Sequence, residues 1–402
     1  MTLGLIVRRS LSQHALSTTV TAASIALGAG LLMSVWVVKE QAQKAFAGVN
    51  SGYDAVLGAR GSKLQLVLNA VFHLESSPGN VRWEDYQAIR AHPSVALAVP
   101  LAMGDNYRGW RIVGTTPELF ERTELGSTGR RFRLANGRWF DPELREAVVG
   151  SFVARQLGLK VGDEFEPYHG LGFDENAHQH EETYVVVGLM EPSNTPADRI
   201  IWIPLEGVQW MGGHDPQAVT EVSAVLVKLK GGGIAGFQLD QLYNKKGDRL
   251  TFAWPIGAVV SDLFNKISWF DGVLEIVAWL VVFVATGSML ASIYNSMNER
   301  RRELAILRAL GARRLTLSAA VVLEAASIAA LGAVAGYGVY ATILAGVASV
   351  VRAQTGLVLE VMHGAPVLVL APLAIIAIGA LAGLIPALKA YHTEVAENLT
   401  PH

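Results

Sequence analysis

The chain has 402 residues, of which 51% are hydrophobic and only 17% are charged, and its mean hydropathy is +0.33. This composition is too apolar for an ordinary soluble protein and indicates a protein that lies partly in a membrane. The formal net charge of −2 gives no basis for binding nucleic acid. The absence of cysteine excludes disulfides, thiolate metal sites and cysteine nucleophiles.

The first apolar run, residues 18–38, follows Arg8 and Arg9 and predicts a transmembrane helix. A cleaved signal peptide is the alternative, but no small-x-small cleavage site directly follows the run. We therefore expect an uncleaved anchor, preceded by a cytoplasmic amphipathic segment over residues 1–17.

Three further apolar runs predict transmembrane helices over residues 267–297, 315–351 and 366–390. Basic residues gather before the first span, between the second and third spans, and after the fourth. The positive-inside rule puts those three places on the cytoplasmic side. The remaining segments are then an outer domain over 39–266, a cytoplasmic coupling helix over 298–314, a short outer loop over 352–365 and a cytoplasmic tail over 391–402.

The large outer segment mixes short strand-like runs with helical patterns. The expected strands lie at residues 111–114, 147–150, 183–188, 200–203 and 224–229, and the clearest helices at 82–91 and 151–158. Intermixed short strands and helices favour an α+β domain. The predicted fold class is a membrane protein with four transmembrane α-helices and a large α+β extracytoplasmic domain between helices 1 and 2.

Residues 298–314 form a short, arginine-dense stretch between two apolar runs. Leu304, Leu307 and Leu310 recur at helical spacing among the charges, which predicts an amphipathic helix that docks against a cytosolic partner. Arginines that only enforce topology or bind anionic membrane lipid are the alternative. We favour docking, because the apolar face would otherwise have no partner.

Two pairs of glycines lie four residues apart in the third and fourth spans. Small residues at this spacing allow helices to approach closely, although ordinary glycine content of membrane helices is the alternative. The candidate helix-packing residues are Gly332, Gly336, Gly379 and Gly383. An acidic residue in the third span, Glu324, is expected to make a structural hydrogen bond within the helix bundle.

Residues 299–312 and 385–390, together with the order of the parts over nearly the whole chain, resemble the FtsX/MacB-like permease family. The outer segments 53–62, 109–116 and 146–150 add to this likeness. These permeases are the membrane subunits of type VII ABC transporters. The resemblance implies a multi-pass protein of the bacterial inner membrane, with its large domain in the periplasm and a second permease copy in a homodimer.

The resemblance further implies that this chain is not an enzyme and that a separate cytosolic ABC ATPase binds ATP and magnesium. The sequence agrees, because it has no Gly-x4-Gly-Lys-Ser/Thr phosphate-binding loop. Closure of the ATPase would move the coupling helix and, through it, the periplasmic domain, which is termed mechanotransmission. The residues expected to contact the ATPase are Glu299, Arg300, Arg301, Glu303, Leu304, Leu307 and Arg308.

Export or extraction of a lipoprotein, peptide, amphiphile or metal-linked cargo is the leading functional hypothesis. One alternative is a non-transporting signal transmitter that activates a periplasmic partner protein such as a cell-wall hydrolase. A metal-handling scaffold is the other. We predict no catalytic residues, because no serine lies in a nucleophile motif such as Gly-x-Ser-x-Gly.

Four histidines of the periplasmic segment are candidate metal ligands: His169, His178, His180 and His214. A His-x-His pair can chelate an ion when the segment is extended, and neutral imidazoles with nearby carboxylates suit zinc. Exposed histidines in a polar loop are the alternative, since His-x-His alone is a weak motif. Zinc is therefore the one candidate cofactor of this chain.

Overall fold

The structure is a computed structural model that describes residues 3–47, 52–125, 130–172, 174, 178–214, 216–299, 312–355 and 364–392. The chain divides into two compact units. The helical unit comprises Met1–Gln41, Ile267–Ser349 and Glu360–His402, and the α+β unit comprises Ala42–Lys266 and Val350–Leu359.

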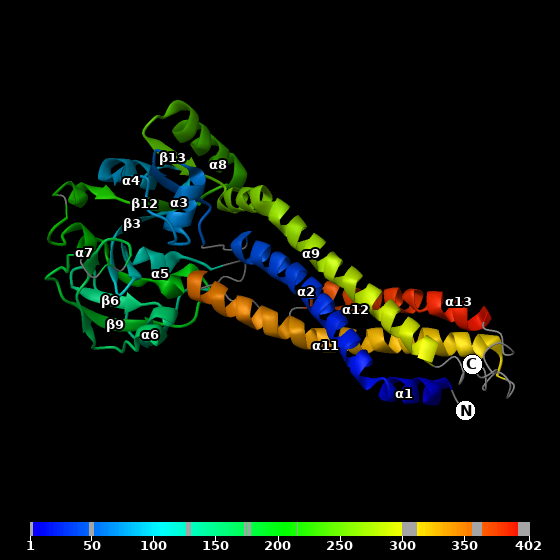
Figure 1. Cartoon of the computed structure of the whole chain (residues 1–402). Helices are drawn as coiled ribbons and strands as arrows, with labels where there is room; N and C mark the ends of the chain where they lie inside the picture. Colours follow the sequence, from blue (N-terminus) through cyan, green and yellow to red (C-terminus); the bar gives the residue numbers. More distant parts are fainter. Residues whose placement is uncertain are drawn as a thin grey trace. The chain divides into compact units, whose positions relative to one another are not determined.

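The helical unit is built from long apolar helices together with the short helices α1 (Leu3–Gln13) and α13 (Leu384–His392) (Figure 1). The others are α2 (Ala15–Ala47), α9 (Ile256–Glu299), α11 (Arg314–Thr355) and α12 (Val367–Ala382). Within the described residues, four stretches are long and apolar enough to cross a membrane: Ala15–Gln41, Ile256–Asn295, Arg314–Gln354 and Val367–Leu388. They overlap the four predicted runs, although the second begins at Ile256, well before the predicted residue 267.

Helices α2 and α11 approach closely at small residues. A Cβ atom added to Gly332 would lie 2.6 Å from the Cβ atom of Ile25, and one added to Gly336 would lie 2.8 Å from that of Ala29. A Cβ atom added to Gly383 would lie 2.6 Å from the Cβ atom of Ala325 in α11. Gly379 is buried and lines a small internal cavity of the same unit. Gly332, Gly336 and Gly383 therefore have no room for a larger side chain.

The hydroxyl of Ser10 in α1 donates a short hydrogen bond to the carboxylate of Glu324 in α11. Ser10 is buried, so the contact satisfies two polar groups inside the helical unit. This confirms the structural hydrogen bond expected of Glu324.

The α+β unit is organised around one sheet, which has 11 strands among the described residues. Its strand order is β13-β1-β12-β3-β4-β10-β6-β9-β5, with β7 beside β9 and β8 beside β3; β2 and β11 form a separate pair. All pairs are antiparallel except β10 with β4 and β6 with β9. The strands are β1 (Ala55–Ala59), β2 (Val81–Arg82), β3 (Val95–Tyr107), β4 (Trp110–Thr115), β5 (Leu134–Gly137), β6 (Glu146–Val149), β7 (Glu164–Phe165), β8 (Tyr168–His169), β9 (Tyr184–Met190), β10 (Ile201–Pro204), β11 (Glu221–Val222), β12 (Ala224–Leu229) and β13 (Leu250–Ala253).

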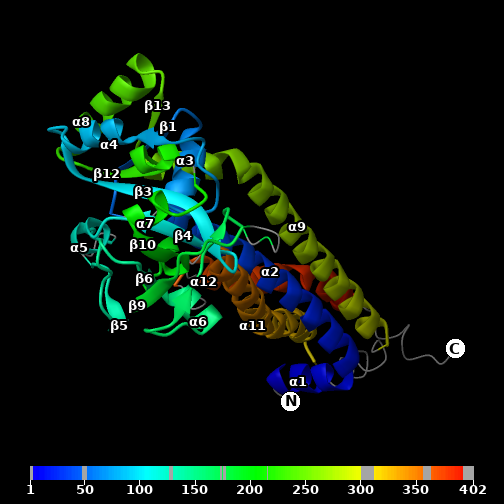
Figure 2. The same ribbon diagram turned by 90° about the vertical axis from the view of Figure 1, so that its left-hand side faces the viewer.

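Hydrophobic cores lie on both faces of the sheet, and helices cover each of them (Figures 1 and 2). Helices α4 (Trp83–Arg90), α6 (Ser151–Leu157), α7 (Leu205–Gln209) and α8 (Gly232–Asp240) pack on one core. Helices α3 (Lys63–Ala70) and α5 (Glu118–Arg122) pack on the other. Successive residues of β1 alternate between the two cores, which explains why this strand is apolar throughout.

Short helical turns complete this unit: η2 (Pro196–Arg199), η3 (Pro216–Thr220) and the π-helical η4 (Gln241–Lys246). The sheet and its two covered faces form the α+β arrangement that the sequence predicts. The five predicted strands correspond to β4, β6, β9, β10 and β12, and the two clearest helices to α4 and α6.

Candidate metal centre

Asp105 lies near the end of β3, the 13-residue strand that crosses the α+β unit (Figure 2). The pairing register between β3 and β4 shifts between Met103 and Asp105, so Gly104 is an extra residue, a β-bulge. Side chains alternate along a strand, and the extra residue therefore places Asp105 on the same face as its partner Ile112. That face carries the core under α4 and α7.

His169 and His180 reach Asp105 from a neighbouring chain segment. Strand β8 pairs antiparallel with β3, and His169 lies directly opposite Asp105. The backbone N–H of His169 donates to the carbonyl of His178 (2.8 Å), and that of His180 donates to the carbonyl of Pro167 (2.9 Å). These backbone bonds fix the segment that carries His180 beside β8 and hence beside the end of β3.

His214 comes from the turn that follows α7. Gly213 has φ +85°, a left-handed conformation that glycine adopts without strain, and it directs the chain back toward the sheet. The N–H of Gly212 donates to a carboxylate oxygen of Glu182 at 2.9 Å, which anchors this turn. The imidazole of His214 thereby faces the same point as that of His180.

Three imidazole nitrogens converge on one carboxylate oxygen. The Nε2 atoms of His180 and His214 each lie 3.1 Å from Oδ1 of Asp105, and Nδ1 of His169 lies 3.6 Å from it. These four donor atoms all lie within 4.8 Å of one another. Asp105 and His180 are buried, His214 is nearly so, and the side chain of His169 is 53% exposed.

The second ring nitrogen of the two inner histidines, His180 and His214, forms a hydrogen bond with a backbone carbonyl group. Nδ1 of His180 lies 2.7 Å from the carbonyl oxygen of Gly212, and Nδ1 of His214 lies 2.9 Å from that of Val208. A carbonyl can only accept, so both Nδ1 atoms carry the hydrogen. In a neutral imidazole the lone pair is then on Nε2, directed at Asp105.

Burial and hydrogen bonding act against each other on these groups. Burial raises the pKa of Asp105, but hydrogen bonds to His180 and His214 outweigh it and hold the pKa below its usual value. The hydrogen bond to Asp105 raises the pKa of both histidines, against the effect of their burial. The carboxylate thus favours a positive charge on the nitrogens that surround it.

The other oxygen of Asp105, Oδ2, is buried and has no hydrogen-bond partner among the described residues. All three histidine contacts fall on Oδ1 alone. A buried carboxylate oxygen without a partner is costly in free energy, so its presence here points to a group that the protein atoms do not supply.

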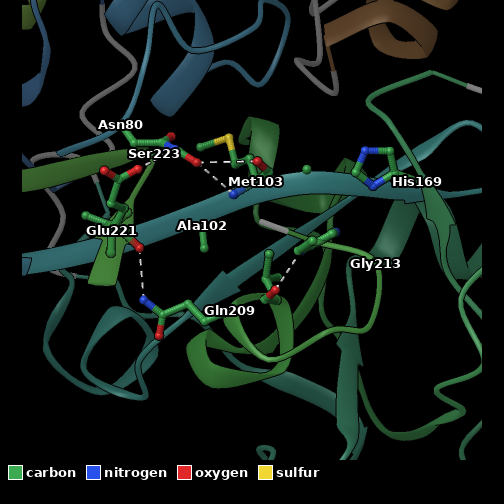
Figure 3. A pocket seen from close by; sticks show the side chains of 12 residues that line it. Asn80, Ala102, Met103, His169, Gln209, Gly213, Glu221 and Ser223 are labelled. Atoms are coloured by element: carbon green, nitrogen blue, oxygen red, sulfur yellow. Dashed lines mark hydrogen bonds between the residues drawn. The ribbon is translucent and has the colours of Figure 1, made fainter. Parts of the chain in front are cut away.

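A cavity of about 340 Å³ opens beside the cluster (Figure 3). His169, Gly213 and His214 lie at one part of its wall, and the small strand pair β2–β11 contributes Glu221 at another. Figure 3 shows His169 at the opposite side from Asn80 and Glu221. Polar and apolar groups line the cavity together, and it gives the cluster a route to the outside.

Three of the four histidines expected as ligands therefore meet, and the fourth donor is one that the sequence did not single out. His178 is not a member of the four-residue group, although its ring centroid lies 5.6 Å from that of His180. Asp105 takes the fourth place. Its only sequence signal is an acidic residue beside a glycine in an apolar run, which identifies no site without the register of β3 and β8.

The residues expected to contact an ATPase lie at or beyond the end of α9. Glu299 is the last residue of that helix, and the other six lie outside the described residues.

Two family models match the chain. The MacB-like periplasmic core domain matches residues 18–234, which is more than half of the chain, and the FtsX-like permease C-terminal domain matches residues 275–395. A comparison with curated protein sequences finds no match.

Among solved structures, the chain is similar to the extracellular domain of the noncanonic ABC-type transporter YknZ from Gram-positive bacteria. Identity is 14%, the TM-score is 0.32, and 49% of this chain and 98% of that one are covered. It is also similar to the periplasmic region of MacB from Actinobacillus actinomycetemcomitans, with 10% identity, a TM-score of 0.35, and coverage of 55% and 94%. At such TM-scores the family assignment depends on the two sequence models. On their evidence the chain belongs to the FtsX/MacB-like permeases, the membrane subunits of ABC transporters.

Proposed function

We propose that this chain transmits the motion of a separate cytosolic ATPase across the bacterial inner membrane to its α+β unit in the periplasm. The observation that carries the proposal is helical continuity. The three boundaries between the two units that lie within the described residues, after positions 41, 266 and 349, fall inside α2, α9 and α11. A continuous helix keeps its rise of about 1.5 Å per residue through its backbone hydrogen bonds, whereas a flexible linker would absorb a displacement.

We place ATP hydrolysis in a separate cytosolic subunit, as the family resemblance implies, and the residues of this chain include no phosphate-binding loop of the P-loop type. The arginine-dense stretch between α9 and α11 is the place where it would dock, through Leu304 and Leu307 on the predicted apolar face. ATP and magnesium then belong to the partner subunit. The work done at the periplasmic side is export or extraction of a lipoprotein, peptide, amphiphile or metal-linked cargo.

A non-transporting signal transmitter would use the same coupling and differ only in what the α+β unit contacts. Stimulation of ATP hydrolysis by a purified periplasmic cargo would separate the two, because a signal transmitter has no cargo that binds and leaves in each cycle. The cluster of Asp105, His169, His180 and His214 favours metal-linked cargo among these possibilities.

Replacing Leu307 with aspartate is expected to abolish co-purification of the ATPase with the detergent-solubilised permease. A charge on the apolar face of an amphipathic helix must lose its solvation when the face is buried against a partner. Ala309→Asp is the matched control, since at 100° per residue it lies on the other side of the predicted helix. Complex formation that survives Leu307→Asp, or is lost equally in both variants, would contradict docking through this face.

A further inference from the structure

We infer that the α+β unit binds one Zn²⁺ ion, held by Asp105, His169, His180 and His214, and that the ion enters and leaves through the cavity beside His169. The inference is independent of the proposed coupling to an ATPase. It rests on the geometry, the hydrogen-bond partners and the burial of these four side chains.

The spacing of the donors fits a tetrahedral ion. Zinc binds nitrogen and oxygen donors at about 2.0–2.1 Å, so two donors of one tetrahedral ion are about 3.4 Å apart. The three nitrogens lie 3.1, 3.1 and 3.6 Å from Oδ1 of Asp105. No pair among the four donor atoms exceeds 4.8 Å, so small rotations of side chains would bring all of them around one ion.

The hydrogen-bond partners of the inner histidines also fit a metal. Ligating histidines commonly donate their other ring N–H to a backbone carbonyl, which fixes the tautomer and turns the remaining lone pair toward the ion. His180 and His214 both do this, through the carbonyl groups of Gly212 and Val208. Neutral imidazoles in this tautomer would direct two lone pairs at a carboxylate, which is repulsive unless a cation lies between them.

Protonation of both imidazoles is the other way to supply positive charge. It would place two imidazolium rings, with centroids 5.1 Å apart, in a pocket where their side chains are 1% and 9% exposed. Like charges at that separation, removed from water, repel strongly. One divalent ion delivers the same charge at the centre of the cluster and uses every donor.

The chemical types of the four donor atoms indicate which metal ion the site would bind. Three imidazole nitrogens and one carboxylate oxygen suit Zn²⁺, whereas Mg²⁺ and Ca²⁺ prefer sites made of oxygen donors. The exposure of the four residues is uneven: Asp105 and His180 are buried, but His169 is half-exposed on the cavity wall. Turning His169 away would open the site, so the ion is exchangeable rather than permanently enclosed.

The test uses the full-length protein in detergent, stripped with a chelator, desalted and titrated with ZnCl₂ by calorimetry, with bound metal counted by mass spectrometry. One equivalent of zinc is expected. His178→Ala is the matched control, since it removes the other histidine of the same His-x-His pair and should leave the zinc affinity within a few-fold of the parent. Asp105→Asn and His180→Ala should each weaken binding by more than the ~10–100-fold typical of losing an outer partner of a ligand.

His169→Ala tests the site even if the variants at buried positions fail to fold. Its side chain is half-exposed, so its removal leaves no buried cavity. It should bind zinc more weakly and release it faster to a chelator. Co²⁺ provides an independent signature, since a tetrahedral site gives intense visible absorption that Asp105→Asn should lose. Absence of zinc uptake by the parent protein would overturn the inference, and so would an equal loss of affinity in His178→Ala and Asp105→Asn.

Discussion

At the scale of single residues, His73 is the clearest case of an ionisable group that is buried without compensation. It is a non-glycine residue at φ +55°, its ring packs edge-on against Trp202 with centroids 5.7 Å apart, and its Nδ1 atom has no hydrogen-bond partner among the described residues. Burial lowers the pKa of His73 to about 3, and the charges of Arg111 and Arg199 act in the same direction.

This histidine makes the folded protein sensitive to acid. Its pKa is about 6.5 in the unfolded chain and about 3 in the folded one, so below pH 6.5 the unfolded state binds the extra proton. As the pH is lowered from 6.5 toward 3, the free energy of unfolding is therefore expected to fall, by on the order of 1 kcal/mol per pH unit from this group. Tryptophan fluorescence of the full-length protein, followed during thermal unfolding at several pH values, measures this dependence.

His73→Phe keeps an aromatic ring against Trp202 and removes the titrating group. Its unfolding midpoint should decline less steeply below pH 6.5 than that of the parent protein. Parallel pH profiles in the two proteins would mean that other groups cause the acid sensitivity.

At the scale of elements, the contact between α2 and α11 depends on glycine at particular positions. Gly332 has no room for a side chain against Ile25, whereas Gly338, six residues along the same helix, has nothing within 4 Å of where a Cβ atom would be. Gly332→Val is expected to lower the stability of the helical unit by about 1–3 kcal/mol, because overpacking forces the helices apart. Gly338→Val makes the same change in helix propensity as Gly332→Val. Apart from that shared effect, it should lower the stability by about 0.5 kcal/mol or less.

The measurement is the thermal unfolding midpoint of each full-length variant in the same detergent. If Gly338→Val lowers the unfolding midpoint as much as Gly332→Val does, the loss of stability comes from placing valine within a helix and not from the contact with α2.

The sequence predicts the elements that follow from a local pattern of residues, and it misses those that depend on pairing between distant strands. The long apolar helices and strands such as β9, whose residues alternate between buried and half-buried, are local patterns, and the sequence predicts them. Strand β3 escapes prediction because it is buried on both faces, contains Pro100 and carries the extra residue Gly104. The sequence predicts the candidate site only in part. Its histidines are conspicuous in the sequence, but Asp105 joins the cluster only through the pairing of β3 with β4 and β8.

At the scale of the whole molecule, the apolar surface left by one copy of the chain is large. Only 20% of the most apolar window of Ile256–Asn295 is buried within a single copy, and Phe283 in that stretch is 76% exposed. Lipid covers such a surface in a membrane, and so does a second copy packed through small and apolar residues. Four candidate spans are few for a complete transporter core, which favours two copies.

Two copies of the permease carrying different affinity tags, expressed together in one cell, are therefore expected to purify as one complex with the ATPase. The control expresses each copy separately and mixes the membranes only after solubilisation, which excludes exchange in detergent. Recovery of only the captured copy under gentle solubilisation would argue for a single permease per complex.

The bulge in β3 bears on how this chain should be compared with other sequences of its family. Strand side chains alternate with a period of two, so a relative that keeps a residue at position 104 but pairs this strand without the bulge would present its acidic residue to the opposite core, even with every histidine retained. Counting histidines would misclassify such a relative. Whether a relative can form the proposed zinc site is better judged by whether its carboxylate pairs with the counterpart of Ile112 and with the counterpart of His169.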